Sequence, residues 1–81
     1  MKYIIFDKIG AGGDVPVIFP ICLEHANVAN CHGGNANVLS AGFVDISDAK
    51  HVSCFSHAVT IPDKPPREED AKIIQRMIDK Y

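Results

Sequence analysis

The strongest strand signals of the chain lie in the stretch NVLSAGFVDISDAKHVSCFSHAVTI, residues 37–61. The short segment SDAK joins two runs that are rich in β-branched and aromatic side chains, residues 37–46 and 50–61. This pattern predicts a β-hairpin. Alternating positions give two faces, and neither face is clearly polar, so we expect both to be covered at least in part. With a four-residue turn, the expected cross-strand pairs are Phe43 with Cys54, Gly42 with Phe55, and Ser40 with His57.

A second hairpin is predicted at the start of the chain. KYIIF (residues 2–6) and VPVIF (residues 15–19) are β-rich runs on either side of the glycine-rich segment DKIGAGGD. Pro16 has no N–H to donate to a strand ladder, so the second run is expected to be an edge strand or to begin at a bulge. The GAGGD segment precedes a strand and not a helix, so it is interpreted as a hairpin tip and not as a phosphate loop.

Two helices complete the predicted elements. The first spans residues 21–31, with Pro20 suited to its first turn and a glycine after its end. A proline-rich connector, residues 61–66, leads to the second helix, which is expected to begin near Pro66 with acidic residues in its first turn. The second helix has an apolar stripe at helical spacing, formed by Ala71, Ile74, Met77, Ile78 and Tyr81.

Together these elements predict one α+β domain over residues 1–81, with the order ββαββα and a four-stranded antiparallel sheet. We expect the two helices to cover one side of the sheet. The other side would then be covered by a second copy of the chain, in a homodimer or a larger homo-oligomer.

Composition excludes some classes of partner. The net charge is −2, and no basic patch or long apolar run is visible, so neither nucleic acid nor a membrane is expected as a partner. No leader sequence is seen either, and a cytoplasmic location is expected. At 81 residues the core of a lone chain is marginal.

The charged residues are unevenly distributed. Residues 63–81 hold ten of the eighteen, whereas Glu24 is the only one between Val15 and Val44. This uncharged segment could be buried in the core of its own chain. The favoured interpretation is that much of it faces another copy, because interface cores are depleted in charge.

All three cysteines and all four histidines lie between residues 22 and 57. Zinc sites use about four such ligands, and a mixed site is conceivable from His25, Cys31, His32 and His51. No spacing requires it, since Cys54 and His57 are three apart on a strand and point to opposite faces. We therefore expect no metal and no cofactor, with the cysteines packed as small core residues.

Catalytic interpretations are weaker still. Ser40 opposite His57 could form a nucleophile and base, but no orienting carboxylate or oxyanion hole is identifiable, so a cross-strand hydrogen bond is preferred. Cys31 beside His32 could form a reactive thiolate, but adjacent residues seldom face each other. No catalytic residues are therefore assigned. The candidate contacts to a ligand or a partner are His25, His32, Asn35, Ser40 and His57.

Four segments, PVIFP, VLSAGFVDI, CFSHAVTI and EDAKIIQRMI, resemble short uncharacterised proteins encoded by phages and prophages. The resemblance covers most of the chain but carries no functional motif. It implies an accessory protein, which would act against a host system by occupying a partner's surface or by sequestering a small molecule.

Three functions are weighed from the sequence. The preferred one is a small, self-associating and non-catalytic binding module, of the phage accessory or inhibitor type, that acts on a host protein. The second is an oligomer that binds a small polar or anionic ligand near the segment CHGGNAN and His57. The third and least favoured is a minimal enzyme that uses a histidine.

Overall fold

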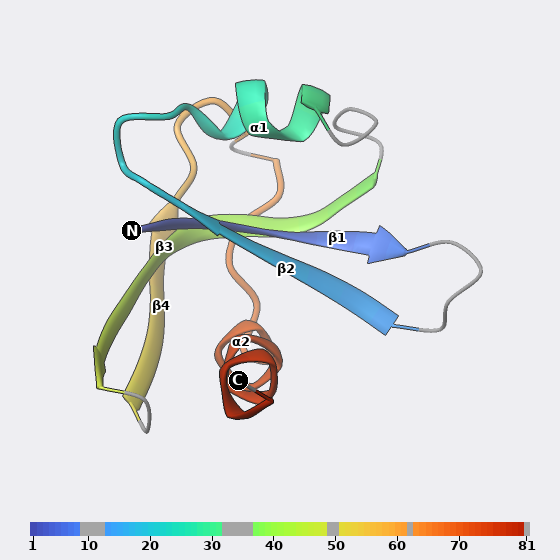
Figure 1. The fold of residues 1–81 in the computed structure, drawn as a ribbon. Helices are drawn as coiled ribbons and strands as arrows, with labels where there is room; N and C mark the ends of the chain where they lie inside the picture. The colour runs from blue at the N-terminus through green and yellow to red at the C-terminus, as the bar shows by residue number, and fades with distance from the viewer. Residues whose placement is uncertain (9–12, 32–36, 49–50, 62, 81) are drawn as a thin grey trace.

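The computed structural model describes residues 1–8, 13–31, 37–48, 51–61 and 63–80. Its four strands form one antiparallel sheet in the order β2-β1-β3-β4, and two helices accompany the sheet (Figure 1). The predicted α+β fold and the order ββαββα are confirmed. The elements are β1 (Lys2–Lys8), β2 (Gly13–Phe19), α1 (His25–Cys31), β3 (Val38–Asp48), β4 (His51–His57) and α2 (Asp70–Asp79).

Both predicted hairpins are present, β1 with β2 and β3 with β4, and the two central strands are β1 and β3. Strand β2 lies at one edge of the sheet, which confirms the edge position predicted from Pro16. Residues 9–12, in the predicted connection between β1 and β2, lie outside the described residues.

The two helices lie on opposite faces of the sheet (Figure 1), so the prediction that both cover one face is wrong. The reason is visible in β1, where Ile4 and Phe6 belong to the core beneath α1, while Tyr3 and Ile5 belong to the core beneath α2. Alternate side chains of a strand point to opposite faces. Because both sets are apolar, each face needs its own cover.

The pairing of β3 with β4 is shifted from the expected register, by one residue from Phe43 to Ile46 and by two residues at Gly42. Phe43 lies opposite Phe55, and Gly42 lies opposite His57, so Ser40 is not opposite His57. Ser56 is the extra residue of a β-bulge at this point, and its φ of 57° lies in the left-handed region. The first shift arises at the turn end, where Asp48 lies opposite His51 and the register changes between Asp48 and Ile46, whereas the bulge at Ser56 adds the second shift at Gly42. Counting from a four-residue turn could foresee neither irregularity.

Strand β4 ends at His57, so the prediction that this strand reaches residue 61 is wrong. Ala58 and Ile61 leave the sheet and are fully buried in the core beneath α1. The chain then crosses to the other face of the sheet (Figure 1), and the N–H of Ala41 in β3 donates to the carbonyl of Lys64 at 3.0 Å. The connector therefore takes the place beside β3 that β4 has left.

Both helices begin later than predicted. Residues 21–23 form a turn in which the N–H of Leu23 donates to the carbonyl of Pro20, and α1 begins only at His25. Helix α2 begins at Asp70 and not near Pro66. Its predicted apolar stripe is supported at Ile74, which is fully buried. Within the described residues, neither helix has the length and apolar character needed to cross a membrane.

Gly42 lies where β3, the bulge of β4 and the connector approach most closely. A Cβ at this position would lie 2.6 Å from the carbonyl oxygen of Ser56 and 2.7 Å from the Pro66 ring. Real Cβ atoms are essentially never found at such distances from other heavy atoms. Glycine is therefore required here for space.

We predict that Gly42→Ala destabilises the protein by about 1–3 kcal/mol, because the added methyl group overpacks a site bordered by backbone. Urea denaturation followed by circular dichroism measures the effect. Ser53→Ala, at an exposed position of β4, serves as the control and should stay within about 0.5 kcal/mol of the original. Equal stability of the Gly42→Ala protein would show that the Pro66 connector moves aside at little cost.

Candidate contact surface

The structure separates the residues predicted as contacts. His25 begins α1 on one face of the sheet, whereas the Ser40 hydroxyl points to Asp70 on the other face. The backbone of His57 ends β4. His32 and Asn35 lie outside the described residues, so their contact with a ligand or a partner stays a prediction. His25 and Ser40 are both buried and cannot belong to one site.

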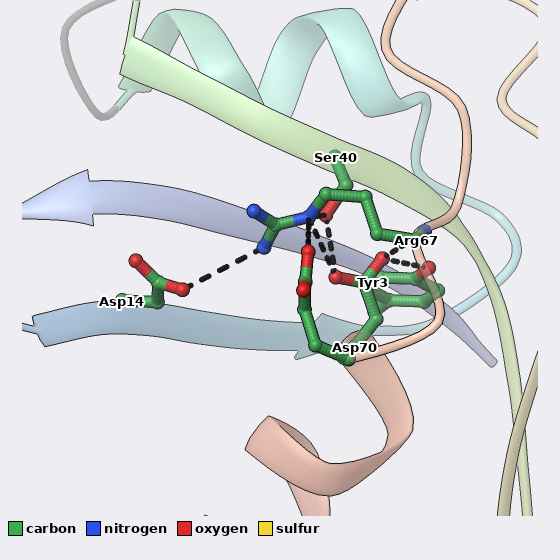
Figure 2. A network of polar contacts seen from close by, with 6 residues as sticks. Tyr3, Asp14, Ser40, Arg67 and Asp70 are labelled. Atoms are coloured by element: carbon green, nitrogen blue, oxygen red, sulfur yellow. Dashed lines mark hydrogen bonds and ion pairs between the residues drawn. The ribbon is translucent and has the colours of Figure 1, made fainter.

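On the α2 face, four residues form a polar group around a buried carboxylate (Figure 2), which we call the Asp70 cluster, namely Tyr3, Ser40, Arg67 and Asp70. The Asp70 carboxylate is completely buried. Its Oδ2 accepts from the Tyr3 hydroxyl at 2.7 Å and from the backbone N–H of Arg67 at 2.9 Å. Its Oδ1 accepts from the Ser40 hydroxyl at 2.8 Å and from Nε of Arg67 at 3.1 Å.

This arrangement explains how an acid is tolerated in the core. A buried carboxylate is costly unless it is paired and hydrogen-bonded, and here both oxygens accept two hydrogen bonds each. The bond to the backbone of Arg67 resembles the reach-back of an acid at the third position of a helix. The Asp70 cluster thereby joins α2 to β1 and β3.

The charges around Arg67 make an anion-binding role unsuitable. Its guanidinium lies 3.1 Å from Asp70, 3.3 Å from Glu69 and 3.6 Å from Asp14. Three carboxylates around one cation leave negative charge in excess, which would repel an anionic ligand.

Two titratable groups on this face have raised pKa values. Burial, and then the hydrogen bond to Asp70, raise the pKa of Tyr3 above its usual value, so the phenol remains a hydrogen-bond donor. Burial also raises the pKa of the neighbouring Cys54 thiol, which disfavours a thiolate at Cys54.

On the α1 face, four rings form a row from the core to the surface. The centroid of Phe19 lies 5.3 Å from that of His25, which lies 5.7 Å from Phe43, and Phe43 stacks on Phe55 at 6.0 Å. Phe19 and His25 are buried, whereas Phe55 is 49% exposed. The exposed ring of Phe55 is therefore packed, through Phe43, against the buried rings of His25 and Phe19.

His25 is held within this row by a hydrogen bond. Its Nε2 lies 2.8 Å from the carbonyl oxygen of Gly42, which can only accept, so Nε2 carries the proton. Burial lowers the pKa of His25, the bond to Gly42 raises it, and the charge of Lys2 lowers it further. The balance is a lowered pKa, which favours a neutral imidazole that holds α1 on the sheet.

Around the outer end of this row lies an exposed surface that is largely apolar. A hollow of about 150 Å³ is lined by Lys2, Glu24, His25, Phe43, Val59 and Thr60. Phe55 adjoins it through Phe43, and Leu23 adjoins it because its carbonyl accepts from Nζ of Lys2 at 2.7 Å. Val59 is 85% exposed and Leu23 46%. We call Lys2, Leu23, Glu24, Phe43, Phe55 and Val59 the contact surface.

Sequence reasoning missed both the Asp70 cluster and the contact surface. Asp70 was interpreted only as one of the acidic residues of the helix's first turn, yet its four-residue spacing from Ile74 places it on the same buried stripe. That spacing was a usable signal. Val59 was assigned to a strand, and only the bulge at Ser56 brings it beside Phe43. No signal in the sequence could have revealed that bulge.

The four cysteine and histidine ligands proposed for a mixed metal site are not all described, because His32 is outside the described residues. Among the residues that are described, no group of three or more His, Cys, Asp or Glu side chains is placed to hold a metal ion. The thiols of Cys22, Cys31 and Cys54 are free. Cys22 and Cys31 are exposed and Cys54 is half-buried, so the prediction that the cysteines pack as small core residues is wrong.

We predict that Asp70→Ala costs about 3 kcal/mol of unfolding free energy, because the donors of Tyr3, Ser40 and Arg67 lose their common acceptor. Urea denaturation measures the loss. The matched control is Glu69→Ala, which removes an adjacent acid that is 58% exposed and also pairs with Arg67. That control should change stability by no more than about 0.5 kcal/mol, and similar losses for both variants would contradict the role of Asp70.

A second prediction concerns pH. Because the pKa of His25 is lowered on folding, the unfolded chain binds a proton that the folded chain does not. Stability from this group is therefore complete above the usual pKa of 6.5 and is lost as pH falls toward the lowered value, by at most about 1.4 kcal/mol per pH unit. Denaturation of the wild-type and His25→Gln proteins between pH 8 and about 5.5 isolates this contribution. Parallel pH profiles for the two proteins would refute it.

Comparison of the chain with family models finds no match, and comparison with curated proteins and with solved structures finds no significant similarity. Neither a family nor an activity can therefore be transferred to this chain. Its function has to be inferred from its own residues.

Proposed function

We propose that this protein is a small, non-catalytic binding module that acts through protein–protein contact at the contact surface. The observation that carries the proposal is a set of exposed apolar side chains at or beside one hollow. Val59 lines the hollow, Phe55 stacks on its lining residue Phe43, and Leu23 accepts through its carbonyl from its lining residue Lys2. Single exposed apolar residues are common on any protein, but a contiguous group with a polar border is typical of an interaction site.

The exposure follows from the lengths of the elements. Helix α1 has seven residues and is about 10 Å long, whereas β3 has eleven residues and is about 36 Å long. So short a helix covers only part of the strand, and it leaves Phe43 half-buried and Phe55 exposed. Covering a side chain such as Phe or Val contributes about 1.5–3 kcal/mol, so a partner has a substantial gain available here.

The aromatic row adds rigidity to this surface. Phe55 rests on Phe43, which is supported in turn by the buried and hydrogen-bonded His25. An aromatic side chain that is already fixed loses little conformational entropy when a partner covers it. Aromatic anchors of this kind commonly supply much of the affinity of an interface.

Two observations support a non-catalytic role. In the Asp70 cluster Tyr3, Ser40 and Asp70 are buried, and the half-buried Arg67 is bonded to Ser40 and to Asp70. His25 is buried with its Nε2 occupied by Gly42. Neither group offers an accessible acid, base or nucleophile to a substrate.

A protein partner also fits the surface better than a small ligand does. The hollow measures about 150 Å³, whereas pockets that enclose drug-sized ligands measure about 300–1,000 Å³. The polar-ligand hypothesis, which placed the ligand near CHGGNAN and His57, involves residues that are mostly outside the described part of the chain. The phage or prophage origin and a host protein as the target stay predictions from the resemblance.

The proposal predicts that a photo-reactive amino acid at Val59 forms a covalent adduct with a specific protein in cells. The control places the same amino acid at Lys72, an exposed position of α2 on the opposite face. The protein identified by mass spectrometry is then purified and should bind the wild-type chain at least tenfold more tightly than a folded Phe55→Asp variant, because that variant puts a charge at an apolar anchor. Adducts at Lys72 but none at Val59 would refute the contact surface.

A further inference from the structure

We infer that the protein bound at the contact surface is a second copy of this chain, in a two-fold dimer that pairs Lys2 of each copy with Glu24 of the other. This inference rests on the proposed function, since it names the partner of the same surface. It is argued from the charges on that surface and from the free cysteines and the lack of a metal-binding group among the described residues.

The contact surface carries one cation and one anion, both of which line the hollow. Nζ of Lys2 donates to the carbonyl of Leu23 and lies 5.9 Å from the centroid of the Phe43 ring. Within the described residues, neither Lys2 nor Glu24 takes part in a salt bridge. Both charges are therefore available to a partner.

Opposite charges on one patch make that patch complementary to itself. In a two-fold interface the same residues face each other from both copies, so a contact from Lys2 to Glu24 occurs twice. The apolar side chains Phe55 and Val59 would likewise be supplied by both copies. A patch with a single sign of charge would instead repel its own copy, so the mixed sign favours a second copy over a partner of strong net charge.

The small size of the fold provides an independent reason. Domains of this length usually add a disulfide, a metal or a subunit contact to a marginal core. The three cysteines are free, and no metal-binding group occurs among the described residues. Of these three ways to stabilise a marginal core, a subunit contact is the one that remains.

The uncharged segment from Val15 to Val44 agrees with this arrangement. It is not wholly buried in its own core, since Leu23 is 46% exposed and Ile21 is 66% exposed. Exposed apolar residues in a segment with a single charge, Glu24, are what the centre of an interface requires.

Sedimentation velocity on the purified protein tests the inference through charge reversal. The wild type should form a dimer, whereas Lys2→Glu and Glu24→Lys should each raise the dimer dissociation constant at least tenfold by placing like charges opposite each other. An equimolar mixture of the two variants should recover a dimer, because each reversed charge then meets its opposite. The control Lys72→Glu, on α2, should leave the dimer unchanged.

Folding of each variant is checked by circular dichroism. Val59→Glu provides a second disruption at a position that is 85% exposed, and it should give a folded monomer. A wild type that is monomeric up to about 1 mM would overturn the inference. A dimer that resists both charge reversals and Val59→Glu would overturn it too, by placing the interface elsewhere. If Val59 cross-links to a different protein while the chain is monomeric, the inference fails but the proposed function stands.

Discussion

The Asp70 carboxylate is the interaction on which the α2 side of the structure depends. It accepts hydrogen bonds from Tyr3 of β1, from Ser40 of β3 and from Arg67, just after the connector, and it lies at the start of α2. A completely buried charge requires every one of these donors, since each unmet lone pair would carry a desolvation cost. The position of α2 on the sheet is therefore fixed by directional bonds as well as by the non-directional packing of Ile74.

The fixed position of α2 constrains the connector that precedes it. Through the connector it also constrains the α1 face of the sheet. Pro66, just before Arg67, lies so close to Gly42 that no Cβ fits between them. The carbonyl of Gly42 in turn accepts from His25, the first residue of α1. Gly42 thus contacts both the residue that begins α1, His25, and the segment that leads into α2, at Pro66. The bulge at Ser56 approaches the same glycine from β4. The two faces of this small sheet are coupled through a few close contacts.

This coupling bears on the proposed binding role. His25 is held by Gly42, and His25 supports Phe43 and Phe55 at the contact surface. The exposed phenyl ring is thus connected to the core by a short series of packed rings. A surface built in this way presents its apolar anchor in a defined position, which lowers the entropic cost of binding. The nearby pair of opposite charges, Lys2 and Glu24, adds a means of selecting the partner.

The sequence by itself determined the identity and order of the elements. β-Branched runs, the helical spacing of Ile74 and Ile78, and the lack of an N–H at Pro16 are local properties, and they predicted the strands, the last helix and the edge position of β2. The faces of the helices, the register of β3 with β4, and the end of β4 were predicted wrongly. These depend on the bulge at Ser56, on the register irregularity between Ile46 and Asp48, and on the crossing of the connector, none of which a count along the sequence can foresee.

The candidate sites show the same division. Sequence pattern singled out histidines and a serine because of their chemistry, but only the tertiary structure decided that His25 and Ser40 are buried on opposite faces. It also placed Asp70 in the core, where three donors from separate segments offset the cost of burying its charge. The contact surface likewise joins residues from β1, the segment before α1, β3, β4 and the segment after β4. Local sequence could not reveal it, because exposure is set by which neighbours the fold brings near.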